Sequence, residues 1–472
     1  MFMNWRSLIA LVIISLVSLP NNTFAQLKDP ISVEAQRSKE VAPKIPLEGF
    51  DQSWLNGNDR RDSSIFHNPF FTPSILVDVN CTHSFNNPID HTVVGSTVIA
   101  RNDEMEISAV VLGGDLNYKN AHARVMTQFG TRPMVISSND VSQFRGQYEI
   151  GKAYRNISEA YAGYHFDKWY GINVDFGMFL SYIGLNSYYQ AENWEYQESF
   201  TSDNTPWFFN GMRTQIFPNK YLRFEIWLIN GWQSYGTFNN LPGFGVNVVW
   251  MPNEHVKFIM NDYYGTETPG LSGRYRFHSD NSFSLRYYNH NKSKKISKAA
   301  ICATFDIGYE KGDGVNAFTT DATRGPAQYF VSAMVYNRLW FAKNKFAWTI
   351  GGGWVTNPGR YLVLYPSGDA SPLPNPYNPT LYGGVAGTHP FSVNPGDPFT
   401  AWDCSTNFCW LPNQSVEFKI EYVHRESSVN YFAGHGGVTS PSGYTYSTLP
   451  GSWAPDLVKA EDRVIFAALF RL

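Results

Sequence analysis

The chain has 472 residues and a formal net charge of −3, with 37 basic and 40 acidic side chains. This balance gives no reason to expect nucleic-acid binding, which depends on a strongly basic surface. Only 16% of the residues are charged, although soluble domains average about 25%, and another 16% are aromatic. Four cysteines in a chain of this length are too few for a disulfide scaffold.

The N-terminus has the pattern of a signal peptide. Arg6 supplies a positive charge, residues 8–19 form an apolar core, and Thr23-Phe24-Ala25 offers small residues at both positions that a signal peptidase reads. The core is shorter than the roughly 20 residues of a spanning helix, so a retained membrane anchor is the less favoured alternative. We predict a cleaved signal peptide over residues 1–25 and an irregular periplasmic leader over residues 26–70.

From residue 71 onward, many segments alternate apolar and polar side chains, as strands do when their two faces meet different surroundings. Tyr221–Trp232 carries large apolar side chains on one face and Arg223 and Glu225 on the other, and Ser415–Glu426 repeats this pattern. In an outer-membrane barrel the apolar face meets lipid and the polar face meets a wet lumen. The repetition favours an all-β fold, a transmembrane antiparallel β-barrel over residues 71–472. A secreted β-sandwich or propeller is the alternative.

One segment, Arg274–Asn289, decides the strand count. Ser279-Asp280-Asn281 resembles a hairpin turn, but a turn there would leave only Arg274–His278 before it, which is too short to cross the membrane. The alternation also continues through the supposed turn, with Arg276 and Arg286 on the same face. We therefore predict one long strand.

This interpretation gives a barrel of sixteen strands, with fourteen or eighteen strands as alternatives. The expected strands lie near residues 75–85, 106–118, 121–132, 157–166, 171–185, 206–217, 220–232, 243–251, 256–266, 273–289, 299–310, 327–342, 346–355, 401–411, 415–426 and 461–472. In such barrels both termini and the short turns lie in the periplasm, and the long loops lie outside the cell. The connections 356–400 and 427–460 are then external, and the Lys-rich turn near 290–298 is the one longer connection on the periplasmic side.

Two cysteines test one of these strands. On a strand over residues 401–411, the Cα atoms of Cys404 and Cys409 would lie about 16 Å apart, at roughly 3.3 Å per residue. A disulfide requires about 4.4–6.8 Å. The strand and the bridge exclude each other, and we favour the strand.

The last twelve residues, Glu461–Leu472, have the pattern of a closing barrel strand. One face is wholly apolar from Val464 to the end of the chain, and the opposite face carries Arg463 and Arg471. A strand that ends the chain with an apolar aromatic face fits the lipid-facing surface of a barrel.

Several short motifs occur in order along the chain. They are Ser53-Trp54-Leu55-Asn56-Gly57, Asn86-Asn87-Pro88-Ile89-Asp90, Gly177–Gly184, Asn230-Gly231-Trp232, Asn357–Leu362, Glu421-Tyr422 with Arg425, and Asn430-Tyr431-Phe432. In these motifs the chain, from about Ser53 to Leu472, resembles the OmpL-like type of outer-membrane β-barrel porins. The resemblance implies a passive porin with no cofactor and no catalytic residue. The chain departs from the usual barrel pattern by ending in Leu472, with Phe470 as the nearest aromatic residue.

The faces expected to line the lumen carry many charged side chains. The pore-lining candidates are Arg124, Arg213, Arg223, Glu225, Arg274, Arg276, Arg286, Glu417, Lys419, Glu421 and Arg425. Charge in a narrow pore sorts permeant ions, so the excess of basic groups predicts a modest preference for anions. The alternative is that these groups form salt bridges that only keep the lumen solvated.

The third external loop, Asn186–Thr205, is the candidate constriction loop and carries Glu192, Glu195 and Glu198. By analogy with general porins, it would fold into the lumen, where its carboxylates would offset the charge of the wall arginines. The sequence alone leaves open whether the loop enters the lumen.

The sequence lacks recognisable patterns of catalysis or metal binding. No G-x-S-x-G motif occurs. Glu417 and Glu421 share a strand face but would lie about 13 Å apart, beyond the roughly 5–9.5 Å of a glycosidase pair. The histidines have no metal-ligand spacing, and the leader is too short for the plug domain of a TonB-type transporter.

The sequence therefore predicts a non-enzymatic outer-membrane porin for small hydrophilic solutes, because about sixteen strands leave an aqueous lumen. The alternative is a non-conducting structural barrel, plugged by its loops or sheathing a partner protein. The expected partners are outer-membrane lipid and small hydrophilic solutes, with no nucleic acid, metal or cofactor. The permeant solute, and whether the barrel forms a homo-oligomer, are left open.

Overall fold

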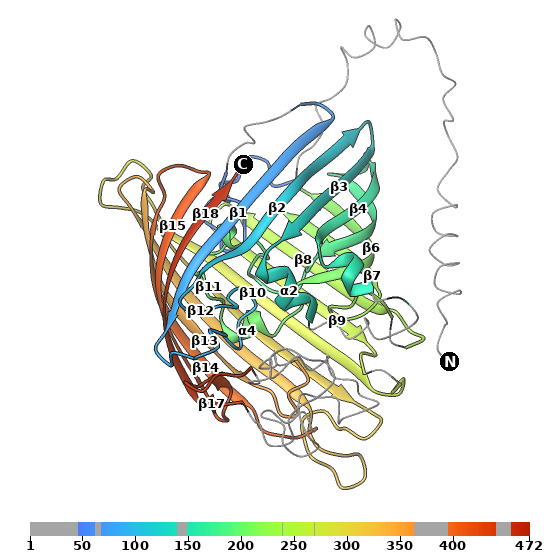
Figure 1. The fold of residues 1–472 in the computed structure, drawn as a ribbon. Coiled ribbons are helices and arrows are strands. Elements are labelled where there is room, and N and C mark those ends of the chain that lie inside the picture. The colour runs from blue at the N-terminus through green and yellow to red at the C-terminus, as the bar shows by residue number, and fades with distance from the viewer. Residues whose placement is uncertain are drawn as a thin grey trace, which may run out of the picture.

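The computed structural model describes residues 46–61, 68–138, 148, 150–237, 239–268, 270–362, 395–439 and 455–472. Within them, sixteen strands form one closed antiparallel barrel, as predicted (Figure 1). Successive barrel strands are neighbours, and the last strand closes on the first. The predicted signal peptide lies outside the described residues.

The barrel strands are β1 (Phe71–Ser84), β2 (Met105–Tyr118), β3 (Ala121–Phe129), β4 (Ile157–Phe166), β5 (Ile172–Leu180), β6 (Phe208–Asn219), β7 (Leu222–Ile229), β8 (Gly243–Asn253), β9 (Val256–Gly265), β10 (Tyr275–Asn289), β11 (Ile296–Lys311), β12 (Tyr329–Phe341), β13 (Phe346–Thr356), β14 (Thr400–Trp410), β15 (Val416–Ser427) and β18 (Ala460–Arg471). The connections contain the helices α2 (Thr131–Ser138), α3 (Ile150–Tyr154) and α4 (Phe200–Asp203), the 3₁₀ helix η4 (Gln190–Glu192), and a small sheet of β16 (Phe432–Ala433) and β17 (Leu457–Val458). In the part of the chain described here, no helix is both long and apolar enough to cross a membrane.

The seam between β1 and β18 is a regular antiparallel ladder. Leu76 lies opposite Arg471, and Ser84 lies opposite Arg463. Next to this ladder, Ile75 and Leu472 exchange two backbone hydrogen bonds of 2.8 and 2.9 Å. The closed ladder leaves no open sheet edge, which a structure embedded in lipid requires.

The strands have an exposed apolar face and a buried, largely polar face, as the alternation predicts. In β18, Phe466 is 55% exposed on the outside, whereas Arg463 is fully buried inside. Outward aromatic rings also pair across strands: Trp410 of β14 stacks on Phe418 of β15 with ring centroids 5.2 Å apart. An exposed surface of large apolar side chains suits contact with lipid tails.

The segment that decides the strand count forms a single strand, as predicted. β10 keeps its ladder on both sides through Asp280, which lies opposite Asn261 of β9 and Asp306 of β11. The strand prediction around Cys404 and Cys409 is also confirmed, because both lie on β14 and neither forms a disulfide.

The prediction of a strand over residues 121–132 was wrong at its C-terminal end. β3 ends at Phe129, Gly130 has a positive φ of 124°, and α2 begins at Thr131. Pro133 has no N–H to donate to a sheet ladder, but it is compatible with the first turn of a helix.

The prediction of a strand over residues 171–185 also extends too far. β5 ends at Leu180, and the backbone N–H of Ile183 donates to the Ser181 hydroxyl at 3.0 Å. Serine often turns the chain in this way by replacing a ladder hydrogen bond with a local one.

The short turns gather at one end of the barrel. Residues 290–295, between β10 and β11, lie beside residues 342–345, between β12 and β13, because the backbone N–H of Lys343 donates to the carbonyl oxygen of Ser293 at 3.0 Å. The Lys-rich turn therefore belongs to the short-turn rim. We assign this rim to the periplasm, where barrels of this kind have their short turns and termini.

Candidate functional site

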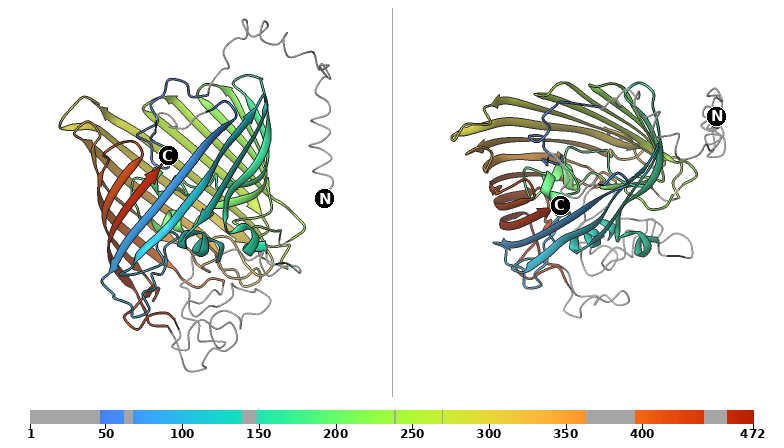
Figure 2. Two further views of the ribbon diagram at one scale, coloured as in Figure 1. Left: turned by 45° about the horizontal axis from the view of Figure 1, so that its top comes forward. Right: turned by 90° about the horizontal axis from the view of Figure 1, so that it is seen from above.

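The loop 186–205 folds into the barrel and crosses the lumen. It leaves the wall between β5 and β6 and contacts β14 and β15, which lie half-way round the ring in strand order. In Figure 2 its green segment lies inside the ring of strands when the barrel is viewed from above. Every residue from Asn193 to Thr205 is buried.

Lys419 and Glu421, two inward residues of β15, hold the backbone of this loop. Lys419 Nζ donates to the carbonyl oxygens of Gln190, Asn193 and Glu195 at 3.2, 2.7 and 3.1 Å. The Glu421 carboxylate accepts hydrogen bonds from the backbone N–H groups of Tyr196 and Gln197 at 2.6 and 3.1 Å. Charged side chains thereby satisfy backbone groups that would otherwise be buried without partners.

Neighbouring strands hold the same loop in the same way. On β14, Asp403 accepts hydrogen bonds from the Ser199 hydroxyl at 2.9 Å and from the backbone N–H of Phe200 at 2.8 Å. On β12, Arg338 Nη1 donates to the carbonyl oxygen of Trp194 at 2.8 Å. Sequence reasoning could not find these contacts, because loop residues have no periodicity that fixes their partners.

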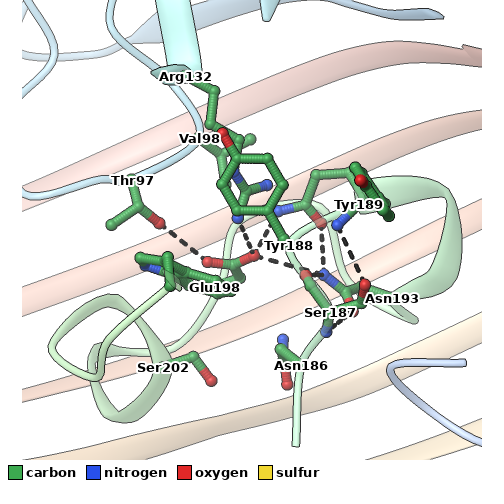
Figure 3. Close-up of polar contacts among 12 residues, drawn as sticks. Thr97, Val98, Arg132, Asn186, Ser187, Tyr188, Tyr189, Asn193, Glu198 and Ser202 are labelled. Carbon is green, nitrogen blue, oxygen red and sulfur yellow. Dashed lines mark hydrogen bonds and ion pairs between the residues drawn. The ribbon is translucent and has the colours of Figure 1, made fainter. Parts of the chain in front are cut away.

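Glu198 is the centre of a buried network inside the loop (Figure 3). Its carboxylate accepts hydrogen bonds from Thr97 Oγ1 at 2.9 Å, Arg132 Nη2 at 3.1 Å and Gln190 Nε2 at 2.5 Å. Arg132 comes from α2 rather than from β3 and lies over the ring of Tyr188, 4.4 Å from its centroid. Burial raises the pKa of Glu198, although Arg132 favours its charged form.

The other two loop glutamates are also engaged. Glu192 forms an ion pair with Arg471 of β18. Glu195 accepts hydrogen bonds from Asn186 and, at 3.4 Å, from Asn56, and burial raises its pKa. All three carboxylates thus lie in the loop that enters the lumen, and each has a described partner.

Residues 46–61 also enter the lumen, from the end that carries the short turns. Trp54 is fully buried, and its Nε1 donates to the carbonyl oxygen of Glu254 at 3.0 Å. Asn56 Oδ1 accepts a hydrogen bond from the backbone N–H of Trp194 at 2.7 Å, which joins this segment to the loop 186–205. At the wall, Arg60 Nη1 donates to Glu417 Oε2 at 2.5 Å. We call residues 46–61 the N-terminal segment.

Asp51 ties the N-terminal segment to the wall. Its carboxylate pairs with Arg286 of β10 and with Lys298 of β11, the latter at 3.1 Å. Burial acts in the opposite direction, but the hydrogen bond from Ser53 and the charge of Lys298 lower the pKa of Asp51 to about 2. The sequence placed this segment in an irregular leader and did not predict its entry into the barrel.

The remaining basic candidates on β10 and β15, and just before β10, either pair with a carboxylate or lie outside the lumen. Arg276 Nη2 donates to Glu310 at 2.7 Å, and Arg425 Nη2 donates to Asp203 at 2.9 Å. Arg274 lies just before β10 and donates to the carbonyl oxygen of Asp313 at 2.7 Å. The structure therefore brings Arg276 and Arg286 into the barrel interior but places Arg274 beside an external connection.

The candidates on β3, β6 and β7 have different surroundings. Arg124 pairs with Asp115 at 2.7 Å and with Glu159 at 2.8 Å, and Arg213 pairs with Asp175 at 2.7 Å. A cavity of about 520 Å³ lies beside them. It is lined by Thr72, Asp115, Asn117, Lys119, Asn120, Ala121, His122, Ala123, Tyr161, His165, Asn173, Arg213 and Gln215.

Arg223 and Glu225 of β7 continue this wall. Arg223 Nε lies 3.1 Å from Glu225 Oε1, and Arg223 Nη2 donates to Asn247 at 3.3 Å.

Within the described residues, no group of three or more histidine, cysteine or acidic side chains is placed to hold a metal ion.

A closed sixteen-stranded barrel with an apolar exterior, a polar interior and an inward-folded loop has the architecture of an outer-membrane porin. The family model described as Putative beta-barrel porin-2, OmpL-like, matches residues 71–449, and the chain belongs to this family. It is therefore an outer-membrane porin, and its family is one of passive channels rather than of enzymes.

Solved structures with a similar arrangement include other barrels of outer membranes. The outer membrane channel DcaP of Acinetobacter baumannii has a TM-score of 0.46 and 11% identity, over 85% of this chain and 97% of that chain. An anion-selective porin from Comamonas acidovorans has a TM-score of 0.47 and 9% identity, over 85% and 99% of the two chains. OmpT of Vibrio cholerae, folded in vitro, has a TM-score of 0.44 and 8% identity, over 87% and 100%. No curated protein sequence matches the chain.

Proposed function

We propose that small hydrophilic solutes diffuse along the side of the lumen formed by β2–β7, through the cavity that Arg213 and Gln215 line. The observation that carries this proposal is a difference in exposure among inward arginines. The side chains of Arg213 and Arg223 are 15% and 37% exposed, whereas those of Arg286 and Arg425 are fully buried. Arg223 lies next to the rim, but Arg213 lies in the middle of β6, so exposure of Arg213 requires water inside the barrel.

The second candidate is a non-conducting barrel. The burial of every residue from Asn193 to Thr205 favours it, as does the complete burial of Trp54, because both segments occupy the lumen. On this reading the cavity beside Arg213 would be a closed vestibule at the periplasmic end rather than a part of a pore.

Single-channel recording in planar bilayers separates these candidates. Protein that shows the heat-modifiable gel mobility of a folded barrel should give discrete conductance steps, and a heat-denatured sample should give none. Repeated failure of folded protein to give steps would favour the non-conducting barrel.

A pair of substitutions on β6 tests the proposed path. Gln215 lines the cavity, whereas its neighbour Thr214 has the opposite phase on the strand. Gln215→Trp should lower the conductance by narrowing the path, and Thr214→Trp should leave it unchanged. Equal conductance for both variants and the wild type would place the path elsewhere.

We also propose that the outward aromatic face contacts outer-membrane lipid directly and that any homo-oligomer forms through part of this face. An assembly would cover exposed rings such as Trp250 and Phe466. Light scattering of detergent-solubilised protein gives its oligomeric state, and a monomer at all concentrations would remove the oligomer from the proposal.

A further inference from the structure

The short-turn rim carries a concentrated positive patch outside the pore. Lys292, Lys294 and Lys295 of one turn and Lys343 and Lys345 of the adjacent turn are all exposed. We call these residues the lysine patch. The two turns contain no acidic residue, and none of the five lysines forms an ion pair with another described residue. Asp51 and Glu254, near the same rim, are engaged by Arg286.

The other turns of this rim lack such a concentration of charge. The turn between β4 and β5 combines Asp167 with Lys168, and the turn between β8 and β9 combines Glu254 with His255. The turns between β2 and β3 and between β6 and β7 have one lysine each, Lys119 and Lys220, and the turn between β14 and β15 has no charged residue. Positive charge is thus gathered on one arc of the rim.

Backbone hydrogen bonds hold the two turns of the lysine patch together. The N–H of Ala342 donates to the carbonyl oxygen of Lys295 at 3.0 Å, and the N–H of Lys343 donates to that of Ser293 at 3.0 Å. The Ser297 hydroxyl donates to Asn344 Oδ1 at 2.8 Å. Ala342, Lys343 and Asn344 all have positive φ, between 50° and 66°, which non-glycine residues adopt at an energetic cost. The like charges are therefore held close together by the fold.

Lipid-facing aromatic residues adjoin the lysine patch. The register between β10 and β11 shifts at Arg286 and Tyr288, and Tyr287 and Tyr288 are 51% and 44% exposed. Such a bulge changes the direction of side chains along a strand. Tyrosines at the end of a barrel strand mark the depth at which the membrane meets water, which is where lipid headgroups lie.

We propose that the lysine patch binds the phosphate groups of anionic phospholipids in the periplasmic leaflet. Clustered basic side chains next to a membrane interface attract anionic headgroups, and each added charge strengthens the attraction. Lysine suits this role because its ammonium is a compact charge on a flexible stem. Because the lysine patch lies on one arc of the rim, lipid would bind at one side of the barrel. This binding would not depend on conduction through the pore.

Lipid titration of the full-length protein in neutral detergent, followed by native mass spectrometry, tests this proposal. The probes are phosphatidylglycerol, phosphatidylcholine with the same acyl chains, and inorganic phosphate. The wild type should bind phosphatidylglycerol at least about tenfold more tightly than phosphatidylcholine, as expected for several adjacent basic groups. A variant with all five lysines changed to glutamine should lose this preference to within about threefold.

Two controls separate the patch from general charge and from misfolding. A variant with the five lysines changed to arginine should keep the preference, because it keeps the charge. Lys168→Gln with Lys220→Gln should also keep it, because these lysines lie on other turns. Heat-modifiable mobility checks that each variant is folded.

Three results would overturn the proposal. The first is an equal affinity of the wild type for both lipids. The second is an unchanged preference in the folded glutamine variant. The third is displacement of lipid by inorganic phosphate at a matched concentration, which would assign the patch to free phosphate.

Discussion

The lumen has two sides that are built from the same strand pattern but have different contents. On the side of β10–β15, charged wall residues meet the backbone of segments that have folded inward: Lys419 binds carbonyl oxygens and Glu421 binds N–H groups. On the side of β2–β7, charged wall residues mainly meet one another, as Arg213 meets Asp175 and Arg124 meets Glu159, although Glu159 also accepts a hydrogen bond from Tyr189 of the loop at 3.0 Å. We call these the filled side and the open side.

The difference shows that alternation fixes where a charged side chain points but not what it does there. A charge that satisfies buried backbone groups positions a loop, and its field is largely compensated by those groups. A charge that faces water in a channel can act on passing ions. The charges of the filled side therefore stabilise the structure, and those of the open side are the better candidates for selectivity.

The largest expected effect comes from Trp54→Ala on the filled side. Trp54 is fully buried, and truncating a buried tryptophan costs about 3–5 kcal/mol. This loss should release the N-terminal segment from the lumen and raise the single-channel conductance. Trp169→Ala, in a turn where the side chain is 54% exposed, is the matched control. Unchanged conductance in Trp54→Ala would show that the segment does not limit the flow.

A smaller effect is expected from Glu421→Ala. The substitution leaves the N–H groups of Tyr196 and Gln197 without their acceptor, at about 1–3 kcal/mol for a buried unsatisfied group. The temperature of heat-modification should fall, and the open-channel current noise should rise as the loop loosens. Glu426→Ala, at an exposed position of the same strand, should change neither. Equal thermal stability in both variants would contradict the bracing role of Glu421.

Acid should weaken the attachment of the N-terminal segment. Because the pKa of Asp51 is lowered from 3.8 to about 2, its pairing stabilises the folded segment fully above its ordinary pKa and is lost as pH falls through 2. Because the Asp51 side chain is partly exposed, solvent screening reduces this loss to about 1 kcal/mol between pH 4 and pH 2.

Peptic cleavage within residues 46–61 over this pH range measures the release of the segment. The Asp51→Asn variant provides the reference, because its attachment should depend less on pH in that window and keeps only the contribution of other carboxylates, such as Glu417 with Arg60. Parallel pH curves for the wild type and the variant would rule out this role of Asp51.

The smallest expected effect concerns selectivity on the open side. Arg223→Gln removes an exposed charge beside Glu225. In water, this charge would interact with a permeant ion 4 Å away by about 1 kcal/mol. The anion-to-cation permeability ratio, measured from reversal potentials, should fall about two- to fivefold. Arg276→Gln combined with Glu310→Gln removes a buried pair at equal net charge and should leave the ratio unchanged. A larger change of the ratio in the double variant than in Arg223→Gln would assign selectivity to the filled side instead of the open side.

The sequence predicted the wall of this barrel well, because strand alternation is a local property. The long strand β10 and the closing strand β18 were predicted from the two-residue alternation of apolar and polar side chains alone. The predicted ends of β3 and β5 were wrong where a glycine or a serine gave the chain a local alternative to the ladder. The phase of Glu417, Lys419 and Glu421 was also predictable, and all three are buried as inward residues.

The contents of the lumen could not be predicted in the same way. The partners of Lys419 are carbonyl oxygens, which every residue carries and no sequence pattern distinguishes. Arg132 is the last residue of the strand predicted over residues 121–132, but it reaches Glu198 from α2. Trp54 and Leu55, adjacent apolar residues in the predicted leader, are buried and were a sequence signal that the N-terminal segment packs inside the barrel.

The bracing of the loop by β15 also sets an order of assembly. Lys419 and Asn193 lie 226 residues apart in the chain, and β15 is followed by only one further barrel strand. The carbonyl oxygens of the loop therefore gain their ammonium partner only when the final hairpin joins the sheet. Until then the loop has only its contacts with earlier segments, such as Arg132 and Arg338, and the half-built wall is open to water. In this porin, closing the sheet and narrowing the passage are one event.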